Sequence, residues 1–181
     1  MLAKIHTATV LGLTAVGVTV EVDVSEGLPG VTIVGLPDAA VKESKERIRA
    51  AIKNTQLGWP QSRVTVNLAP ADVRKEGSAF DLPIALALLA ASKQLDPDCF
   101  SNTVALGELA LDGTLRPVPG VLAVAMGSNG KRLLVPAANA AEAAIVAGVS
   151  VYPMEHLHQV VQFLKGEEPV APLRSDPADW F

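Results

Sequence analysis

The sequence predicts a mixed α/β fold, and three of its stretches carry this prediction. From Val16 to Val24, valines alternate strictly with polar residues and a glycine, which is the period of a strand with one buried face. Residues 63–91 read as a strand, a charged loop and an apolar helix. After residue 103, short apolar strands alternate with helical segments. We therefore expect antiparallel strands first and strand–helix units afterwards, rather than a pure doubly wound sheet.

The N-terminal stretch reads as a hairpin followed by a third strand. Residues 4–10 and 16–24 form its two arms, with Leu11-Gly12-Leu13 as the turn. Residues 25–30 contain two glycines and a proline and are predicted as a loop. A short buried strand follows at 31–34. These strands precede the first helix and supply the antiparallel part of the predicted sheet.

The first helix is predicted to begin at Asp38, which is a suitable N-cap, although Pro37 could move the start by one residue. Gly58 and Pro60 are expected to end it. Its apolar stripe consists of Val41, Ile48, Ala51 and Ile52, and its solvated face of Lys42, Glu43, Lys45, Glu46 and Arg49. This amphipathic pattern predicts a helix that packs one side on the sheet.

Residues 63–91 form the unit around which the rest of the chain is arranged. Residues 64–68 alternate as a half-buried strand, 69–79 form a polar loop, and an apolar helix runs from about 80 to 93. A charged loop between two buried elements is a common position for a functional site. The candidate interaction residues here are Asn67, Asp72, Arg74, Lys75, Glu76, Ser78 and Asp81.

The remaining elements follow as alternating strands and helices. In order, we expect a turn at 96–98, strands at 103–111 and 114–118 joined at Asp112-Gly113, a helix at 121–126, a strand at 132–135, an alanine-rich helix at 137–147 stopped by Gly148, a strand at 149–152, and a helix at 155–164 closed by Gly166. From residue 167 onward, three prolines in a polar context predict a linker or tail. The predicted domain is therefore 1–166, with 167–181 leading away from it.

Composition limits the classes of function. The chain has 181 residues, a net charge of −4 and a pI of about 5.3, so any DNA contact must use a local patch or a neighbouring domain. Cys99 is the only cysteine, which excludes an internal disulfide and a thiol-based metal or redox pair. The longest apolar run, 82–91, is too short for the roughly 20 residues that span a bilayer. We expect a soluble, cytoplasmic protein without membrane contact.

Nucleotide and metal motifs are incomplete. The nearest match to a phosphate-binding loop is 127–131, but Ala125 stands where its first glycine belongs and Arg132 where its hydroxyl residue belongs. We interpret this stretch as a turn and expect no ATP hydrolysis by this chain alone. His156 and His158 are two residues apart on a predicted helix and so lie on different faces. We expect surface histidines and no metal site.

Two enzymatic hypotheses remain from the residues themselves. Asp72, Glu76 and Asp81 offer carboxylates for acid–base chemistry, although Asp81 is better explained as a charge at the start of the buried helix. Ser78 lies close in sequence to Lys75, and a Ser–Lys dyad can perform acyl transfer without histidine. The dyad is the more specific hypothesis of the two.

The stretch VNLAPADVRKEGSAFDLPIALALLAA resembles the N-terminal domain of the magnesium-chelatase-like AAA+ proteins of the competence-protein ComM type. The opening of the chain and the segments GELALDGTLRPVPGVL and VVQFLKGE are similar to the same family, so the resemblance covers roughly 1–166. It implies a fold like domain 2 of ribosomal protein S5, shared with the Lon protease domain and the RadA C-terminal domain. It also implies a longer protein with an AAA+ ATPase module that holds ATP and Mg²⁺. Such proteins act as ring-shaped, hexameric helicases that promote DNA branch migration in natural transformation.

The resemblance to Lon bears on the dyad. Aligned with the Lon motif, the serine nucleophile falls on Ala79, and Ser78 replaces the preceding proline. The partner lysine falls near Leu122, and there is no lysine from 115 to 130. The resemblance therefore implies a domain without catalysis and without a cofactor of its own. Its expected partners are its own ATPase module and neighbouring subunits, with DNA as a further partner.

Three alternatives stay open for the loop. It could hold a neighbouring subunit, the ATPase module or a DNA backbone; it could be braced by its own ion pairs; or the chain could be a pure interaction scaffold without DNA contact. A Lon-type peptidase that uses Ser78 is the remaining enzymatic alternative.

Overall fold

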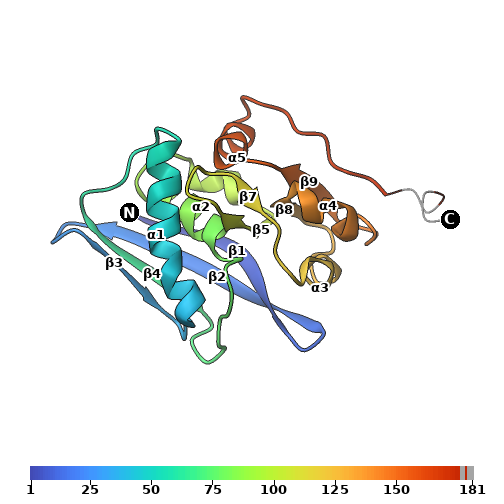
Figure 1. The fold of residues 1–181 in the computed structure, drawn as a ribbon, viewed down its shortest axis with the longest axis horizontal. Coiled ribbons are helices and arrows are strands. Elements are labelled where there is room, and N and C mark those ends of the chain that lie inside the picture. The colour runs from blue at the N-terminus through green and yellow to red at the C-terminus, as the bar shows by residue number, and fades with distance from the viewer. Residues whose placement is uncertain (176–177, 179–181) are drawn as a thin grey trace.

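A computed structural model describes residues 1–175 and 178 and contains a seven-stranded sheet in the order β3-β4-β2-β1-β5-β8-β9. Figure 1 shows this sheet running from β3 at one side to β9 at the other. β1 and β4 each pair antiparallel with β2, and the other neighbouring strands are parallel. The strands are β1 (Leu2–Leu11), β2 (Thr14–Ser25), β3 (Gly30–Val34), β4 (Arg63–Ala69), β5 (Thr103–Ala105), β8 (Arg132–Pro136) and β9 (Ser150–Met154). The predicted mixed α/β fold is confirmed.

Five α-helices, a short 3₁₀-helix and a small hairpin complete the described residues. They are α1 (Ala39–Asn54), α2 (Asp81–Ala91), η1 (Pro97–Phe100), the hairpin strands β6 (Glu108–Leu109) and β7 (Leu115–Arg116), α3 (Val121–Met126), α4 (Ala137–Ala143) and α5 (Leu157–Leu164). None of these described helices has the length and apolar character needed to cross a bilayer.

The two faces of the sheet carry separate cores. Along β8, Leu134 packs into one cluster of buried side chains, whereas its neighbours Leu133 and Val135 pack into the other. Because successive side chains of a strand point to opposite faces, the two clusters lie on opposite sides of the sheet. The larger core contains residues of α1, α2 and α5, and the smaller one contains residues of α3 and α4.

α2 lies at the centre of the larger core, and every one of its residues is buried. It packs against β1, β2 and α1. A helix that is apolar all round needs such an enclosed position, because it has no face suited to water. The predicted buried helix is confirmed, although it ends at Ala91 rather than Lys93.

The predicted strand at 103–111 is wrong in its continuity. β5 ends at Ala105, and the chain then turns toward the start of α2, where Gly107 accepts from Leu82 N–H and donates to the carbonyl of Ala79. Pairing resumes in β6, which forms the predicted hairpin with β7 across the Asp112-Gly113 turn. The interruption follows from contacts between segments far apart in sequence.

Two predicted helices are longer than the observed ones. α4 ends at Ala143 instead of Ala147, and α5 begins at Leu157 because His156 caps it by accepting from the N–H of His158. The described part of the predicted tail follows the edge of the sheet, where Leu173 N–H donates to Val151 O at 2.7 Å. Residues 176–177 and 179–181 of that tail lie outside the described residues.

Candidate functional site

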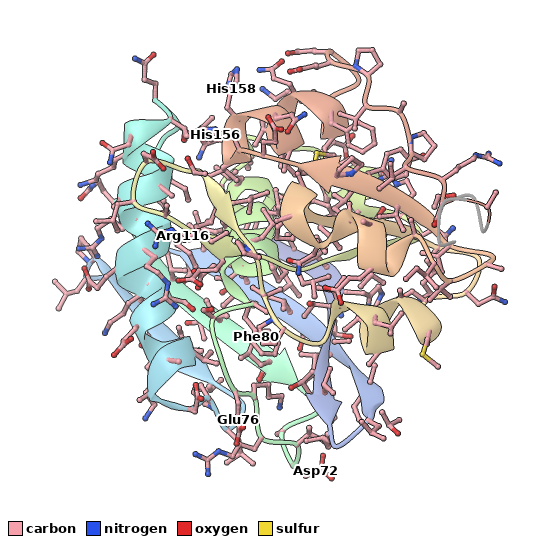
Figure 2. All side chains as sticks on the ribbon, turned by 45° about the vertical axis from the view of Figure 1, so that its right-hand side comes forward. Asp72, Glu76, Phe80, Arg116, His156 and His158 are labelled. Carbon is pink, nitrogen blue, oxygen red and sulfur yellow. The ribbon has the colours of Figure 1, made fainter. Side chains whose placement is uncertain are left out.

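The loop between β4 and α2 contains most of the predicted interaction residues, and the structure divides them by exposure. Asp72, Arg74 and Glu76 are exposed, and Asn67 and Ser78 are half-buried. Lys75 and Asp81 are completely buried. Figure 2 shows Asp72 and Glu76 at one end of the molecule and Phe80 within its body.

We expected the charges of the loop to be available to partners. Lys75 departs most from this expectation, because none of its surface is exposed (0%). Its Nζ donates to the carbonyls of Gly35, at 2.8 Å, and Pro70. Its backbone donates to Leu36 O and accepts from Asp38 N. Burial lowers the pKa of Lys75, while Asp72 opposes this change. The residue therefore fastens the loop to the segment that joins β3 and α1.

Asp38 provides the second fastening. As predicted, it is the N-cap of α1, with Oδ1 accepting from Val41 N–H at 2.8 Å. Its Oδ2 accepts from Gly77 N–H at 3.2 Å. One carboxylate thus fixes both the start of a helix and the far end of the loop, so the loop backbone is held from two sides.

Asp81 is the most heavily bonded carboxylate of the site. It accepts from Arg47 Nε at 2.7 Å, from Arg47 Nη2 at 3.0 Å, from Ser44 Oγ and from Leu109 N–H at 3.0 Å. Burial raises the pKa of Asp81, and the hydrogen bonds from Arg47 and Ser44 oppose that shift. It is the first residue of α2, as expected of a charge at that helix start, but its side-chain bonds reach α1 and β6.

Sequence reasoning did not single out Arg47 or Glu108. Arg47 lies one turn after the buried Ser44 on α1, so a polar pair on the inner face of that helix was the available signal. Glu108 Oε2 accepts from the Ser78 hydroxyl at 3.1 Å. No local pattern connects positions 30 residues apart, so this contact had no signal in the sequence.

The two groups of the hypothetical dyad have separate partners. The Ser78 hydroxyl bonds Glu108, whereas the Lys75 amine bonds two backbone carbonyls. Of the two lost dyad positions, Ala79 lines a pocket at the start of α2. Leu122 is 39% exposed on α3 and does not line that pocket.

The exposed charges of the loop pair with each other. Arg74 Nε lies 3.2 Å from Glu76 Oε1, and their side chains are 68% and 67% exposed. An ion pair this exposed contributes at most about 1 kcal/mol, so both charges remain available to a partner. The side-chain amide of Asn67 donates from Nδ2 to Glu21 Oε1, on the neighbouring strand, at 2.9 Å.

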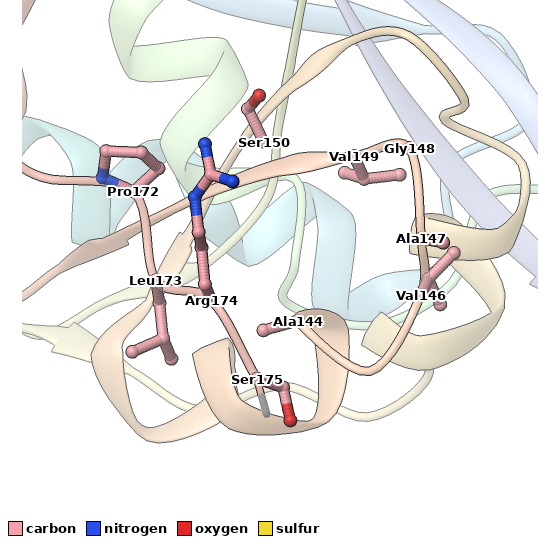
Figure 3. A pocket seen from close by; sticks show the side chains of 10 residues that line it. All are labelled: Ala144, Val146, Ala147, Gly148, Val149, Ser150, Pro172, Leu173, Arg174 and Ser175. Carbon is pink, nitrogen blue, oxygen red and sulfur yellow. The ribbon is translucent and has the colours of Figure 1, made fainter. Parts of the chain in front are cut away.

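One pocket of the described residues lies beside the loop, and another lies away from it. The first, of about 320 Å³, lies beside the loop and is lined by Ala8, Thr9, Val10, Glu76, Gly77, Ser78, Ala79, Phe80, Leu106, Pro119, Gly120 and Val124. We call it the loop pocket. The second, of about 440 Å³, lies between the tail and the segment from α4 to β9, where Arg174 reaches toward Ser150 (Figure 3). None of the predicted site residues lines the second pocket.

The remaining predicted features have structural roles. His156 and His158 lie at the end of the molecule opposite Asp72 (Figure 2), and His156 Nε2 is 2.8 Å from Asp112 O. Residues 127–131 form a turn before β8, in which Lys131 N–H donates to Ser128 O. Among the described residues, no three His, Cys, Asp or Glu side chains gather where they could hold a metal ion.

Comparison of the sequence with known proteins places the chain in a family. The sequence profile described as "Subunit ChlI of Mg-chelatase" matches residues 20–139, more than half of the chain. The chain belongs to this ChlI family. The matched segment begins within β2, ends within α4, and includes α1, the loop and α2. The contacts of Lys75 and Asp81 therefore lie inside the part that defines the ChlI family.

Curated relatives match the chain over nearly its full length. Competence protein ComM of Haemophilus influenzae is 47% identical over 92% of this ChlI-family chain and 33% of its own length. The uncharacterized protein YifB of Salmonella typhimurium is 44% identical over 98% of the chain and 36% of its own length. Rv2897c of Mycobacterium tuberculosis is 40% identical over 94% of the chain and 34% of its own length. The chain thus spans about a third of the length of these relatives.

Proposed function

We propose that this chain is the N-terminal, non-catalytic module of a ComM-type AAA+ ATPase, in which it serves assembly or DNA handling. The similarity to competence protein ComM carries this proposal. In the full protein, a hexameric ring in the cytoplasm would hold ATP and Mg²⁺ in its ATPase modules and drive branch migration of DNA during natural transformation. The module would have the fold of ribosomal protein S5 domain 2, as in Lon and RadA.

The bonding of the loop supports a role in contact rather than catalysis. A Ser–Lys dyad needs the lysine amine within hydrogen-bond reach of the serine, and the Ser78 hydroxyl donates to Glu108 rather than lying against the Lys75 amine. The Lys75 amine, the other half of the dyad, is held by carbonyls of Gly35 and Pro70. Both groups stiffen the loop, and a stiff loop presents its exposed charges in a fixed arrangement.

Arg74 is the residue of this loop best placed to meet DNA. It is exposed, and its partner Glu76 is equally exposed, so a phosphate could replace that carboxylate. The net charge of −4 provides no general attraction for nucleic acid, so contact would depend on such local groups. Lys75 is unsuited to the role, because its amine is buried.

Measuring DNA binding at several salt concentrations tests whether the chain handles DNA, as proposed. Binding of labelled single- and double-stranded DNA is measured by fluorescence anisotropy at several salt concentrations, with the chain and with Arg74→Ala. We expect binding that weakens with salt, and a log–log slope reduced by about 1 in Arg74→Ala. Lys165→Ala removes the same charge at the exposed end of α5 and serves as the matched control. Equal effects of the two variants would exclude the loop as the DNA contact.

The rival functions have distinct outcomes. A pure interaction scaffold predicts no DNA binding at any salt concentration. A peptidase predicts covalent labelling of Ser78 by a fluorophosphonate probe, which Ser78→Ala abolishes. We expect no labelling, because the hydroxyl has a carboxylate rather than an amine as its partner.

A further inference from the structure

The two outer edges of the seven-stranded sheet differ in how they are covered. At the β9 edge, the tail adds a bridge between Leu173 and Val151. At the opposite edge, β3 pairs with β4 on one side, and no segment of the described chain pairs with its other side. Figure 1 shows β3 as the outermost strand at that side of the sheet. The outward N–H and C=O groups of β3 are therefore open to a further strand.

The sequence around β3 lacks the charges that normally protect an open edge. Exposed edge strands are usually blunted by charged side chains, by bulges or by a proline within the strand. Residues 27–37 contain no charged residue, and the strand itself, GVTIV, is rich in β-branched side chains, which favour strand pairing. Pro29 and Pro37 lie outside the strand, so they limit the length of a further pairing without blocking the strand itself.

Both faces of β3 have apolar surface that the chain itself leaves uncovered. Val31 and Ile33 pack against the larger core, but both remain only partly buried. On the other face, Val34 is exposed, and a Cβ atom added at Gly30 would meet nothing within 4 Å. A neighbouring strand at this edge would cover apolar groups on both faces of the sheet.

The strand is complementary to a second copy of itself when the two run antiparallel about Thr32. Val31 then lies opposite Ile33 of the second copy, on the face of the larger core. Gly30 lies opposite Val34, so each exposed valine side chain faces the open space at a glycine. Apolar residues meet apolar residues on one face, and a large residue meets the smallest one on the other, which is the self-complementarity that a two-fold interface requires.

The flanking residues agree with the same centre. Leu28 and Leu36, four residues before and four after Thr32, are 89% and 53% exposed, and the two-fold axis brings each toward the other leucine of the second copy. A centre at Thr32 pairs all five residues of β3 with one another. A shift of the second copy by two residues would instead place Pro29 or Gly35, which lie outside the strand, opposite β3.

We infer that β3 pairs antiparallel with β3 of a second copy of this chain, on a two-fold axis at Thr32. No like charges meet in the paired segment, because the nearest charges along the chain, Glu26 and Asp38, lie beyond the two prolines. Residues 28–36 take part, fewer than the roughly 20–30 residues per side of a standard interface, so the dimer should dissociate on dilution. The inference does not rest on the proposed function, since a two-fold contact joins two chains and closes no ring.

Sedimentation equilibrium of the chain at concentrations from roughly 5 to 500 µM tests the inference, and we expect a reversible monomer–dimer equilibrium. Thr32→Lys places two like charges directly opposite each other at an exposed position and should weaken dimerisation about ten-fold or more. Leu13→Lys introduces the same charge on the turn between β1 and β2, where Leu13 is 95% exposed, and serves as the matched control. Circular dichroism verifies that both variants fold. A chain that stays monomeric, or equal weakening by the two variants, would overturn the inference.

Disulfide cross-linking tests where the axis lies. Cys99→Ser removes the only cysteine, and Thr32→Cys then adds one on the axis. Directly opposite residues of an antiparallel pair have Cα atoms about 4.5–5.5 Å apart, within the range that a disulfide spans. Oxidation with copper–phenanthroline should therefore link Thr32→Cys chains to each other, whereas Gly30→Cys chains should link to Val34→Cys chains and not to themselves. Dimers without a link through Thr32→Cys, or self-linking of Gly30→Cys, would contradict the pairing of β3 with itself about Thr32.

Discussion

Asp81 connects three separate segments through one buried carboxylate. Ser44 and Arg47 reach it from α1, Leu109 N–H reaches it from β6, and Asp81 itself begins α2. A buried charge is tolerated only when partners replace the water it has lost. The position of α1 over the start of α2 therefore depends on this one side chain.

Replacing Asp81 should destabilise the fold strongly. Asp81→Ala leaves the Arg47 guanidinium without its main partner in a largely buried position, so we expect the free energy of unfolding to fall by about 3–5 kcal/mol. Glu43→Ala removes the other carboxylate within ion-pair distance of Arg47, 3.8 Å away and mostly exposed, and should cost less than about 1 kcal/mol. Urea denaturation of both variants measures the difference. Similar costs would show that Asp81 is not the essential partner.

The buried amine of Lys75 should make the free energy of unfolding depend on pH. Burial lowers its pKa from 10.5, so the folded protein binds this proton less tightly than the unfolded chain does. The free energy of unfolding contributed by Lys75 therefore rises as the pH increases from neutral toward and beyond 10.5. Lys75→Met removes the titrating amine and keeps most of the side-chain volume.

We accordingly expect the stability of the unmodified chain, relative to Lys75→Met, to increase over this pH range in urea denaturation at matched pH values. A relative stability of the Lys75 form that stays level or decreases would contradict the prediction.

At the scale of elements, sequence periodicity predicted the strands and helices whose burial pattern is set by neighbouring residues in the chain. The alternating valines of β2 and the uninterrupted apolar residues of α2 identify these elements because burial on one face or on all faces has a distinct period. The end of β5 at Ala105 was missed because contacts of Gly107 with Ala79 and Leu82 decide it. Such contacts join residues far apart in the chain, and no local period records them.

In the candidate site, too, local features were predicted from the sequence and features set by distant contacts were not. The sequence located the loop and most of its polar residues, since a charged segment between two buried elements is visible locally. It did not reveal that Lys75 is buried, because the carbonyls of Gly35 and Pro70 that hold the amine come together only in the folded chain. Burial of a charge depends on its partners, and partners are a property of the tertiary structure.

The close approach of the β3–α1 segment to β4 can be tested at Gly35. A Cβ atom there would lie 2.2 Å from the Leu68 carbonyl oxygen, and the residue has a φ of +104°. Gly35→Ala should therefore lower the free energy of unfolding by about 4 kcal/mol or more. Gly12→Ala is the control, because Gly12 also has a positive φ, +65°, but has open space around it.

Gly12→Ala should cost only about 1 kcal/mol, the penalty of the backbone conformation alone. Chemical denaturation of both variants separates the clash from the backbone penalty. If the two costs were equal, the packing of Gly35 against Leu68 would not be what restricts that position.

At the scale of the whole molecule, the two cores define what folds together. The larger core joins β1, β2 and β4 to α1, α2 and α5, and the smaller core lies under α3 and α4. Every fully buried member of both clusters precedes residue 166, and from the described tail only the half-buried Val170 packs against the larger core. The domain boundary at Gly166 stays a prediction.

A chain truncated after Gly166 tests that boundary. It keeps both cores but loses the packing of Val170 and the hydrogen bond from Leu173 N–H to Val151 O, so the edge of β9 becomes open. We expect cooperative unfolding with an almost unchanged denaturant m-value and a loss of about 1–2 kcal/mol. Val170→Ala in the longer chain should reproduce part of that loss, because it removes the packing and leaves the strand-edge hydrogen bond in place. Non-cooperative unfolding, or a much lower m-value, would mean that residues beyond 166 belong to the folding unit, because m scales with the surface exposed on unfolding.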